Sequence, residues 1–238
     1  MKRDVVSELI RRLLPFLTCN KMIDAIIVPK RQKFYPRHER SRPYLTPAEV
    51  DKLLKASKDK SLSRHPERDY CLILLMVRHG LRVSEACKLK ISDVQMDEMQ
   101  LNVKRLKNGK PATHPLYDLE IKAIKSWLAV RQVMSMEHLT IGAGDWLFIS
   151  DRRTPLSRSM AHRIIQTYAK AAGLGDLNAH PHMLRHSCGY DLANRGADTR
   201  LIQDFLGHRN IQHTVRYTEL APARFEVLYQ DRRTVARR

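Results

Sequence analysis

The 238-residue sequence has few cysteines, no long apolar run and no secretion signal. Its four cysteines, Cys19, Cys71, Cys87 and Cys188, form no CxxC pair, which argues against a zinc ribbon. The longest apolar run, CLILLMV at residues 71–77, is far shorter than the ~20 residues of a membrane span. The N-terminus lacks the apolar core of a signal peptide. We therefore expect a cytoplasmic protein with reduced thiols and no membrane partner.

Acidic residues are also scarce relative to basic ones. Lys and Arg number 43 against 25 Asp and Glu, so the formal net charge is +18. Such an excess attracts polyanions, and DNA or RNA is the expected partner. An anionic membrane is disfavoured, because no segment combines a basic face with a bulky apolar one. Charge alone does not separate DNA from RNA, or an enzyme from a passive binder.

The chain divides by composition into an arm, a folded domain and a tail. Residues 1–43 are basic and contain prolines, and a short helix is expected at 5–14. This segment is either a solvated tail or an arm that contacts DNA. The folded domain begins at LTPAEV, where Thr46 and Glu49 form a capping box around Pro47 at the first helical position.

Most of the domain has helical periodicity. Two short strands are expected around Asn108-Gly109, a dipeptide favoured in two-residue hairpins. DWLFIS at residues 145–150 is either a further strand or an extended connector. The sequence therefore predicts a mainly α fold with a small antiparallel β-sheet. The remaining helices are expected at 66–79, 84–89, 118–134, 157–172, 181–195, 199–206 and 212–218, and another follows residue 222.

The segment PHMLRHS at residues 181–187 carries candidate functional side chains. His182, Arg185 and His186 are spaced to share one face at a helix N-terminus, where backbone N–H groups favour an anion. They are either a phosphate clamp or solvated polar residues. A zinc site of the HExxH type is disfavoured, because Leu184 replaces the glutamate.

Other candidates are scattered along the chain. Arg82 follows a helix end, and Glu85 could orient its guanidinium, although an ordinary surface ion pair would look the same. Lys107 adjoins the hairpin turn and alone would be taken as solvated. Tyr217 lies nine residues after His208 in a basic segment with few apolar neighbours, which disfavours core packing. Stacking on a base remains possible but does not explain that interval, so packing, stacking and a chemical role all stay open for Tyr217 at this point.

Together these segments resemble the tyrosine recombinases, also called the phage integrase family. GLRVSE, HMLRHS and LGHRNIQHTVRY are similar to the family's boxes in type, order and spacing, and the resemblance covers residues 44–222. RLKNGKPATHPL and the longer segments around these boxes look most like the short fimbrial-switch invertases. Larger relatives carry an additional N-terminal DNA-binding domain, whereas only 43 residues precede the match here.

The resemblance implies the DNA breaking-rejoining enzyme fold and a site-specific recombinase that acts on double-stranded DNA. Tyr217 would attack a phosphodiester and form a 3′-phosphotyrosyl intermediate, without metal, ATP or another cofactor. Arginines suit the phosphate, because a guanidinium binds its oxygens bidentately. The expected catalytic residues are Arg82 and Arg185 on the phosphate, His208 as a donor, His182 as base or orienting group, Lys107 as general acid and Tyr217 as nucleophile.

The resemblance also implies a homotetramer on DNA, aided by accessory DNA-bending proteins, in a bacterial cytoplasm close to the nucleoid. The basic tail at 223–238 is expected to exchange between protomers. Inversion of a promoter segment in phase variation is favoured, while integration or excision of a mobile element and dimer resolution would use the same residues. A non-catalytic transcription regulator, a type IB topoisomerase and a metal-dependent nuclease are the alternatives from other classes.

Overall fold

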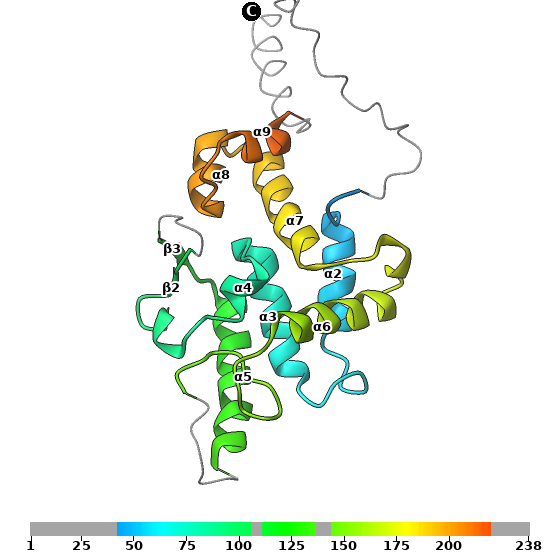
Figure 1. Cartoon of the computed structure of the whole chain (residues 1–238), viewed down its shortest axis with the longest axis vertical. Coiled ribbons are helices and arrows are strands. Elements are labelled where there is room, and N and C mark those ends of the chain that lie inside the picture. The colour runs from blue at the N-terminus through cyan, green and yellow to red at the C-terminus, as the bar shows by residue number, and fades with distance from the viewer. Residues whose placement is uncertain (1–41, 106–110, 137–143, 220–238) are drawn as a thin grey trace, which may run out of the picture. The chain divides into compact units, whose positions relative to one another are not determined.

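The computed structural model describes residues 42–105, 111–136 and 144–219. It confirms a mainly α fold with a small antiparallel sheet (Figure 1). Residues 1–41 of the expected arm at 1–43, the hairpin turn at Asn108-Gly109 and the expected tail at 223–238 lie outside the described residues. The elements in chain order are α2 Pro47–Ala56, α3 Pro66–His79, α4 Val83–Ala86, η3 Ile91–Asp93, β1 Val94–Gln95, β2 Gln100–Val103, β3 Ala112–Pro115, α5 Asp118–Met136, α6 Arg158–Ala171, η4 Gly175–Leu177, α7 Pro181–Asn194, α8 Thr199–Leu206 and α9 Gln212–Thr218.

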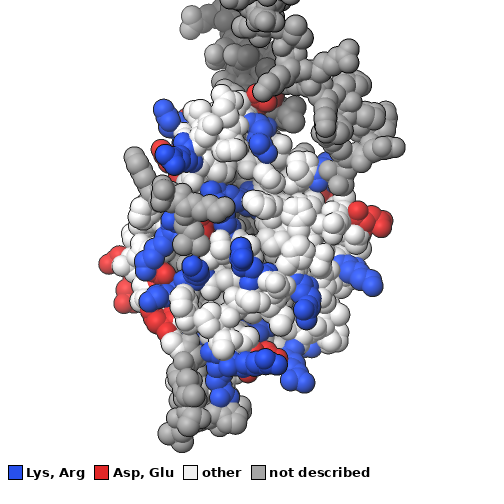
Figure 2. Space-filling model, in the orientation of Figure 1, with Lys and Arg blue, Asp and Glu red and all other residues white. Residues whose placement is uncertain are grey.

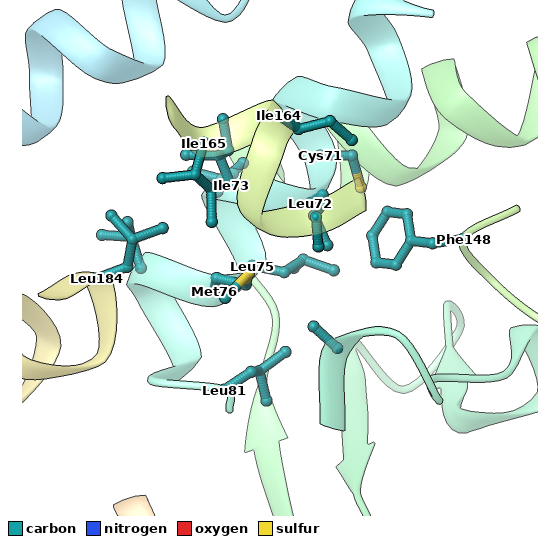
Figure 3. Packing of buried hydrophobic residues seen from close by; sticks show 14 of the residues in the cluster. Cys71, Leu72, Ile73, Leu75, Met76, Leu81, Phe148, Ile164, Ile165 and Leu184 are labelled. Atoms are coloured by element: carbon teal, nitrogen blue, oxygen red, sulfur yellow. The ribbon is translucent and has the colours of Figure 1, made fainter. Parts of the chain in front are cut away.

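Helix α3 forms the centre of the core. It begins at Pro66 and ends at His79, and the C-cap Gly80 has a φ of 57°, the left-handed conformation that glycine adopts without strain. Leu72 and Leu75 are fully buried and face Phe148 (Figure 3). The apolar run at 71–77 is therefore the central core helix, packed against α5 and α7. Its last turn leads directly into the segment that carries Arg82.

The local signals at the helix ends are confirmed. Thr46 and Glu49 form the expected capping box at the start of α2. The helix expected at 84–89 is shorter, because Leu89 O accepts a hydrogen bond from Leu147 N at 2.8 Å. Lys90 then pairs with Trp146 as an isolated bridge, so the chain must be extended there. DWLFIS is correspondingly an extended connector.

The sheet has the order β1-β2-β3, with both pairs antiparallel. Leu101 and Val103 on β2 are buried, and His114 on β3, the partner of Leu101, is buried beside them. β1 was not predicted, because two residues are too short to show a period of two. Strand β3 contacts α8, so this buried face of the hairpin adjoins the C-terminal helices.

Helices α7, α8 and α9 gather at one end of the described domain (Figure 1). Asp198 caps α8 by accepting hydrogen bonds from the N–H groups of Arg200 and Leu201, and Gly207 ends it with φ 66°. A second apolar cluster lies between these helices, comprising Cys188, Tyr190, Ala193, Ile202, Leu206 and Tyr217. Within the described residues, no helix is long and apolar enough to cross a membrane.

Candidate active site

Arg82 stands at the N-cap of α4, directly after the turn that ends α3. Its Nη1 donates to Glu85 Oε1 at 2.6 Å, and its backbone N–H donates to Glu85 Oε2 at 3.0 Å. Nη2 reaches the carbonyl oxygen of Gly207 at 3.4 Å. The side chain is 24% exposed. The contact expected with Glu85 is present, and the guanidinium is oriented while remaining accessible to a phosphate.

Arg185 projects from the first half of α7 and is buried. Its Nη1 donates to Gly80 O at 2.5 Å and its Nη2 donates to Leu206 O at 2.6 Å. Burial, together with the charges of Arg82 and Arg105, lowers the pKa of this guanidinium to about 10. The group remains a cation at neutral pH, held between the end of α3 and the end of α8.

His208 follows Gly207 and turns back toward the arginines. Its Nδ1 lies 2.8 Å from Thr214 Oγ1. Burial, with the nearby charges of Arg185 and Arg82, lowers the pKa of His208 to about 3. The imidazole is therefore neutral at physiological pH. With Nδ1 accepting from the threonine hydroxyl, its Nε2–H can donate to a phosphate oxygen.

Tyr217 lies inside the second apolar cluster, only 1% exposed. Its hydroxyl oxygen is 2.8 Å from His186 Nδ1, and its ring meets Tyr190 edge-on at 5.1 Å and stacks on His208 at 6.1 Å. A Cβ added at Gly189 would lie 2.7 Å from two ring carbons, so the ring rests on the bare backbone of α7.

The expectation that Tyr217 has little packing is wrong. Its apolar neighbours come from α7 and α8 rather than from its own segment, where none is visible in sequence. Burial raises the pKa of the hydroxyl to about 12, although the charges of Arg185 and Arg216 oppose that rise. The phenol is thus protonated and enclosed.

The structure brings Arg82, Arg185, His208 and Tyr217 together. His182 is exposed on the first turn of α7, with its ring stacked 6.1 Å from that of His186. Lys107 lies outside the described residues. Within residues 42–105, 111–136 and 144–219, no group of three His, Cys, Asp or Glu side chains is arranged to hold a metal ion.

Two neighbours of the site were not among the predicted catalytic residues. His186 was noted only for its place on the helix face, yet it holds the tyrosine hydroxyl. Arg105 was missed, although a signal for it exists. It continues the alternation of Leu101 and Val103 beyond the end of β2, and all three side chains are buried.

Three arginines converge on the last carbonyls of α8. A helix C-terminus leaves such carbonyls without intrahelical partners and carries partial negative charge, which suits cationic donors. The three pairs are Arg105 with Phe205 O, Arg185 with Leu206 O and Arg82 with Gly207 O. Glu85 also accepts from Arg105, at 2.9 Å. Among the described residues, Glu85 is the carboxylate that pairs with two of these three guanidiniums, which leaves a largely buried positive charge that can receive an anion.

One face of the described domain is also basic. In Figure 2, Lys and Arg side chains spread over the face that is shown, while Asp and Glu gather mainly at its edges. Such a surface favours contact with a phosphate backbone, because each neutralised phosphate releases counterions.

A helical domain that surrounds a tyrosine with arginines and a histidine defines the catalytic domain of a tyrosine recombinase. Residues 43–224 match the phage integrase family, and the chain belongs to this family. It is therefore an enzyme that cleaves and rejoins DNA, and double-stranded DNA is its partner.

Within this family, the chain is similar to the following proteins. The chain is 48% identical over 186 residues to the type 1 fimbriae regulatory protein FimB of Escherichia coli K12, covering 78% of this chain and 88% of FimB. It is 48% identical over 189 residues to FimE of the same strain, covering 79% and 91%. The crystal structure of XerH site-specific recombinase bound to palindromic difH substrate, a post-cleavage complex, has a TM-score of 0.67 at 26% identity, covering 80% of this chain and 53% of XerH.

Proposed function

We propose that the chain is a DNA invertase of the phase-variation type, which reverses a segment between two specific sites. The observation that carries this role is its 48% identity to two fimbriae regulatory proteins over about nine tenths of their length. The basic surface and the buried positive charge beside Tyr217 support a reaction at a DNA phosphate. The enzyme would then act in the bacterial cytoplasm, close to the nucleoid.

In the proposed reaction, the scissile phosphate takes the place of the carbonyl oxygens that now accept from Arg82 and Arg185. Their guanidiniums neutralise the charge that develops on the phosphate oxygens, and His208 donates a further hydrogen bond. The Tyr217 oxygen bonds to phosphorus and the bond to the 5′-oxygen breaks. The products are a 3′-phosphotyrosyl linkage and a free 5′-hydroxyl, which keep the bond energy for rejoining.

Two protons move in this step. The phenol is a weak nucleophile while protonated, so a base has to accept its proton. The 2.8 Å contact favours His186 for holding the hydroxyl before reaction, and the resemblance assigns His182 as the base or orienting group. The departing 5′-oxygen needs a proton, which we assign to Lys107 as general acid by the same resemblance.

We further propose that four protomers act on two sites with DNA-bending proteins as accessories, and that residues 223–238 exchange between protomers. The tail contains apolar residues at Phe225, Val227 and Leu228. A groove of about 400 Å³, whose lining includes Leu54 and Phe205, offers an apolar surface for such a segment. Truncation before residue 222 should abolish synapsis of two sites while single-site binding persists, and unchanged synapsis would contradict the exchange.

Tyr217→Phe tests the catalytic assignment. The variant keeps the ring and should bind its DNA site with unchanged affinity, yet form no covalent adduct on a nicked substrate. A transcription regulator would keep its cellular function in this variant. An adduct formed by the Tyr217→Phe variant would refute Tyr217 as nucleophile.

The biological role is tested by recombination between paired sites. Inversion is expected with inverted sites, whereas strand exchange only with a circular element would indicate an integrase.

A further inference from the structure

Arg105 is an arginine whose side chain is fully buried beside the active site. Its Nη1 donates to Glu85 Oε2 at 2.9 Å, and its Nη2 donates to the carbonyl oxygen of Phe205 and lies 3.4 Å from His114 Nε2. We propose that Arg105 is a positioning residue for the reaction, which acts through Glu85 to keep the Arg82 guanidinium oriented and available to the scissile phosphate. This inference rests on the proposed role of Arg82 in binding that phosphate.

The shared carboxylate is the first step of the argument. Glu85 uses one oxygen for the Arg82 guanidinium, at 2.6 Å, and the other for Arg105 and for the Arg82 backbone. Burial opposes ionisation of this carboxyl, but the N–H of Arg82 and the charge of Arg105 together lower its pKa. A carboxylate bound by two guanidiniums neutralises neither completely. If Arg105 were absent, the whole charge of Glu85 would fall on Arg82 and compete with the phosphate.

Geometry adds a second step. Arg105 and Arg82 donate to carbonyls two residues apart at the end of α8, so Arg105 ties the carboxylate to the same helix end that Arg82 contacts. Gly207 leaves room for this arrangement, because a Cβ there would lie 2.8 Å from Arg105 Nε. When a phosphate draws Arg82 away from the Gly207 carbonyl, Arg105 still holds Glu85 in place. The contact between Glu85 and Arg82 is therefore preserved during the reaction.

Residue His114 fixes the orientation of Arg105 from the other side. His114 Nε2 lies 3.4 Å from Arg105 Nη2, and its Nδ1 lies 3.3 Å from His79 Nδ1. Phe205 stacks on the His114 ring with a centroid separation of 4.0 Å. Burial lowers the pKa of His114 to about 3, so this neighbour stays neutral and adds no charge. Arg105 thus adds a positive charge in a fixed place.

The test compares Arg105→Gln and Arg105→Lys with Arg68→Gln as a matched control. Arg68 is also buried and donates to the carboxylate of Asp69 at 2.8 Å and to Ile149 O at 3.2 Å. It stands near the start of α3, about 18 Å along the helix from Gly80 at the usual rise per residue. Its loss should lower thermal stability by a similar amount without a selective effect on cleavage.

We expect Arg105→Gln to slow covalent adduct formation on a saturating suicide substrate by roughly 10- to 100-fold, less than the loss of a direct donor. DNA affinity should remain within about threefold, because the Arg105 side chain is fully buried. Arg105→Lys keeps the charge but cannot reproduce the three contacts, so it should recover part of the rate. Arg68→Gln should retain the wild-type rate at temperatures where it is folded.

A second substrate separates positioning from simple loss of structure. A methylphosphonate at the scissile position removes one negative charge, and with it much of the demand on Arg82. The rate ratio of wild type to Arg105→Gln should shrink by about tenfold on this neutral substrate, as it should for Arg82→Ala. An equal loss on both substrates, or no loss at all, would overturn the proposal for Arg105. If instead Arg82→Ala shows no relief, the proposed role of Arg82 fails, independently of Arg105.

Discussion

The contact between Gly189 and Tyr217 leads to a prediction whose sign is unusual. Gly189 lies within α7, where replacing glycine by alanine ordinarily adds about 0.5–1 kcal/mol to the free energy of unfolding. Here the new Cβ would lie 2.7, 2.7 and 2.9 Å from three Tyr217 ring carbons. Carbon atoms prefer about 3.5–4.0 Å, so the ring has to withdraw by roughly 1 Å.

Two contacts oppose this withdrawal of the ring. Tyr190 meets it edge-on at 5.1 Å, and its hydroxyl is held by His186 at 2.8 Å. Overpacking of this kind costs about 1–3 kcal/mol, which exceeds the helical gain. We therefore expect Gly189→Ala to lower the free energy of unfolding by about 1 kcal/mol and the Tm by about 2–4 °C.

A double-mutant cycle with Tyr217→Ala isolates the contact, with urea unfolding as the assay. When the ring is absent, Gly189→Ala should stabilise the chain, which corresponds to a coupling energy of about 1–3 kcal/mol. Tyr217→Phe keeps the ring and should keep the penalty. The reasoning is refuted if Gly189→Ala stabilises the wild type and the Tyr217→Ala variant equally, because the ring would then not rest on Gly189.

Two further predictions concern buried groups near the site. Burial lowers the pKa of His79 to about 4 and that of His114 to about 3, so their contribution to stability is present above pH 6.5 and is lost as the pH falls toward 4. Urea unfolding at pH 7 and pH 5 should show this loss, and His114→Gln should make it shallower by about 1.4 kcal/mol per pH unit at most. Gly207→Ala should reduce the free energy of unfolding by about 1–3 kcal/mol through overpacking against Arg105, in addition to the strain of its φ of 66°. Gly173→Ala has a φ of 72° but open space, so it should show the backbone strain alone, and equal losses in both variants would contradict the packing argument.

The helix boundaries were predictable because they depend on local chemistry. The capping box at Thr46 and the glycines at 80 and 207 mark ends that the structure confirms. The helix expected at 84–89 ends at Ala86, because Leu89 and Lys90 pair with a segment more than fifty residues away. No local pattern carries that information.

The candidate site was predictable in its residue types and less so in its environment. The family resemblance named Arg82, Arg185, His208 and Tyr217 as candidates, and the structure brings these four residues together. The burial of Tyr217 was not predictable, since the apolar side chains around it belong to α7 and α8. Arg105 was predictable in part. The alternation of the strand indicates that its side chain is buried, whereas its hydrogen bond to Glu85 depends on tertiary structure.

The three carbonyl groups at the end of α8 that accept from arginines also have a consequence for the order of folding. Along the chain, Phe205 is 100 residues from Arg105, Leu206 is 21 residues from Arg185 and Gly207 is 125 residues from Arg82. Contacts of such sequence separation form only after the intervening loops have closed, which makes them slow to assemble. Opening of the end of α8 alone would disconnect all three arginines at once. Amide exchange in α8 should therefore report, in a single short helix, whether the candidate site is assembled.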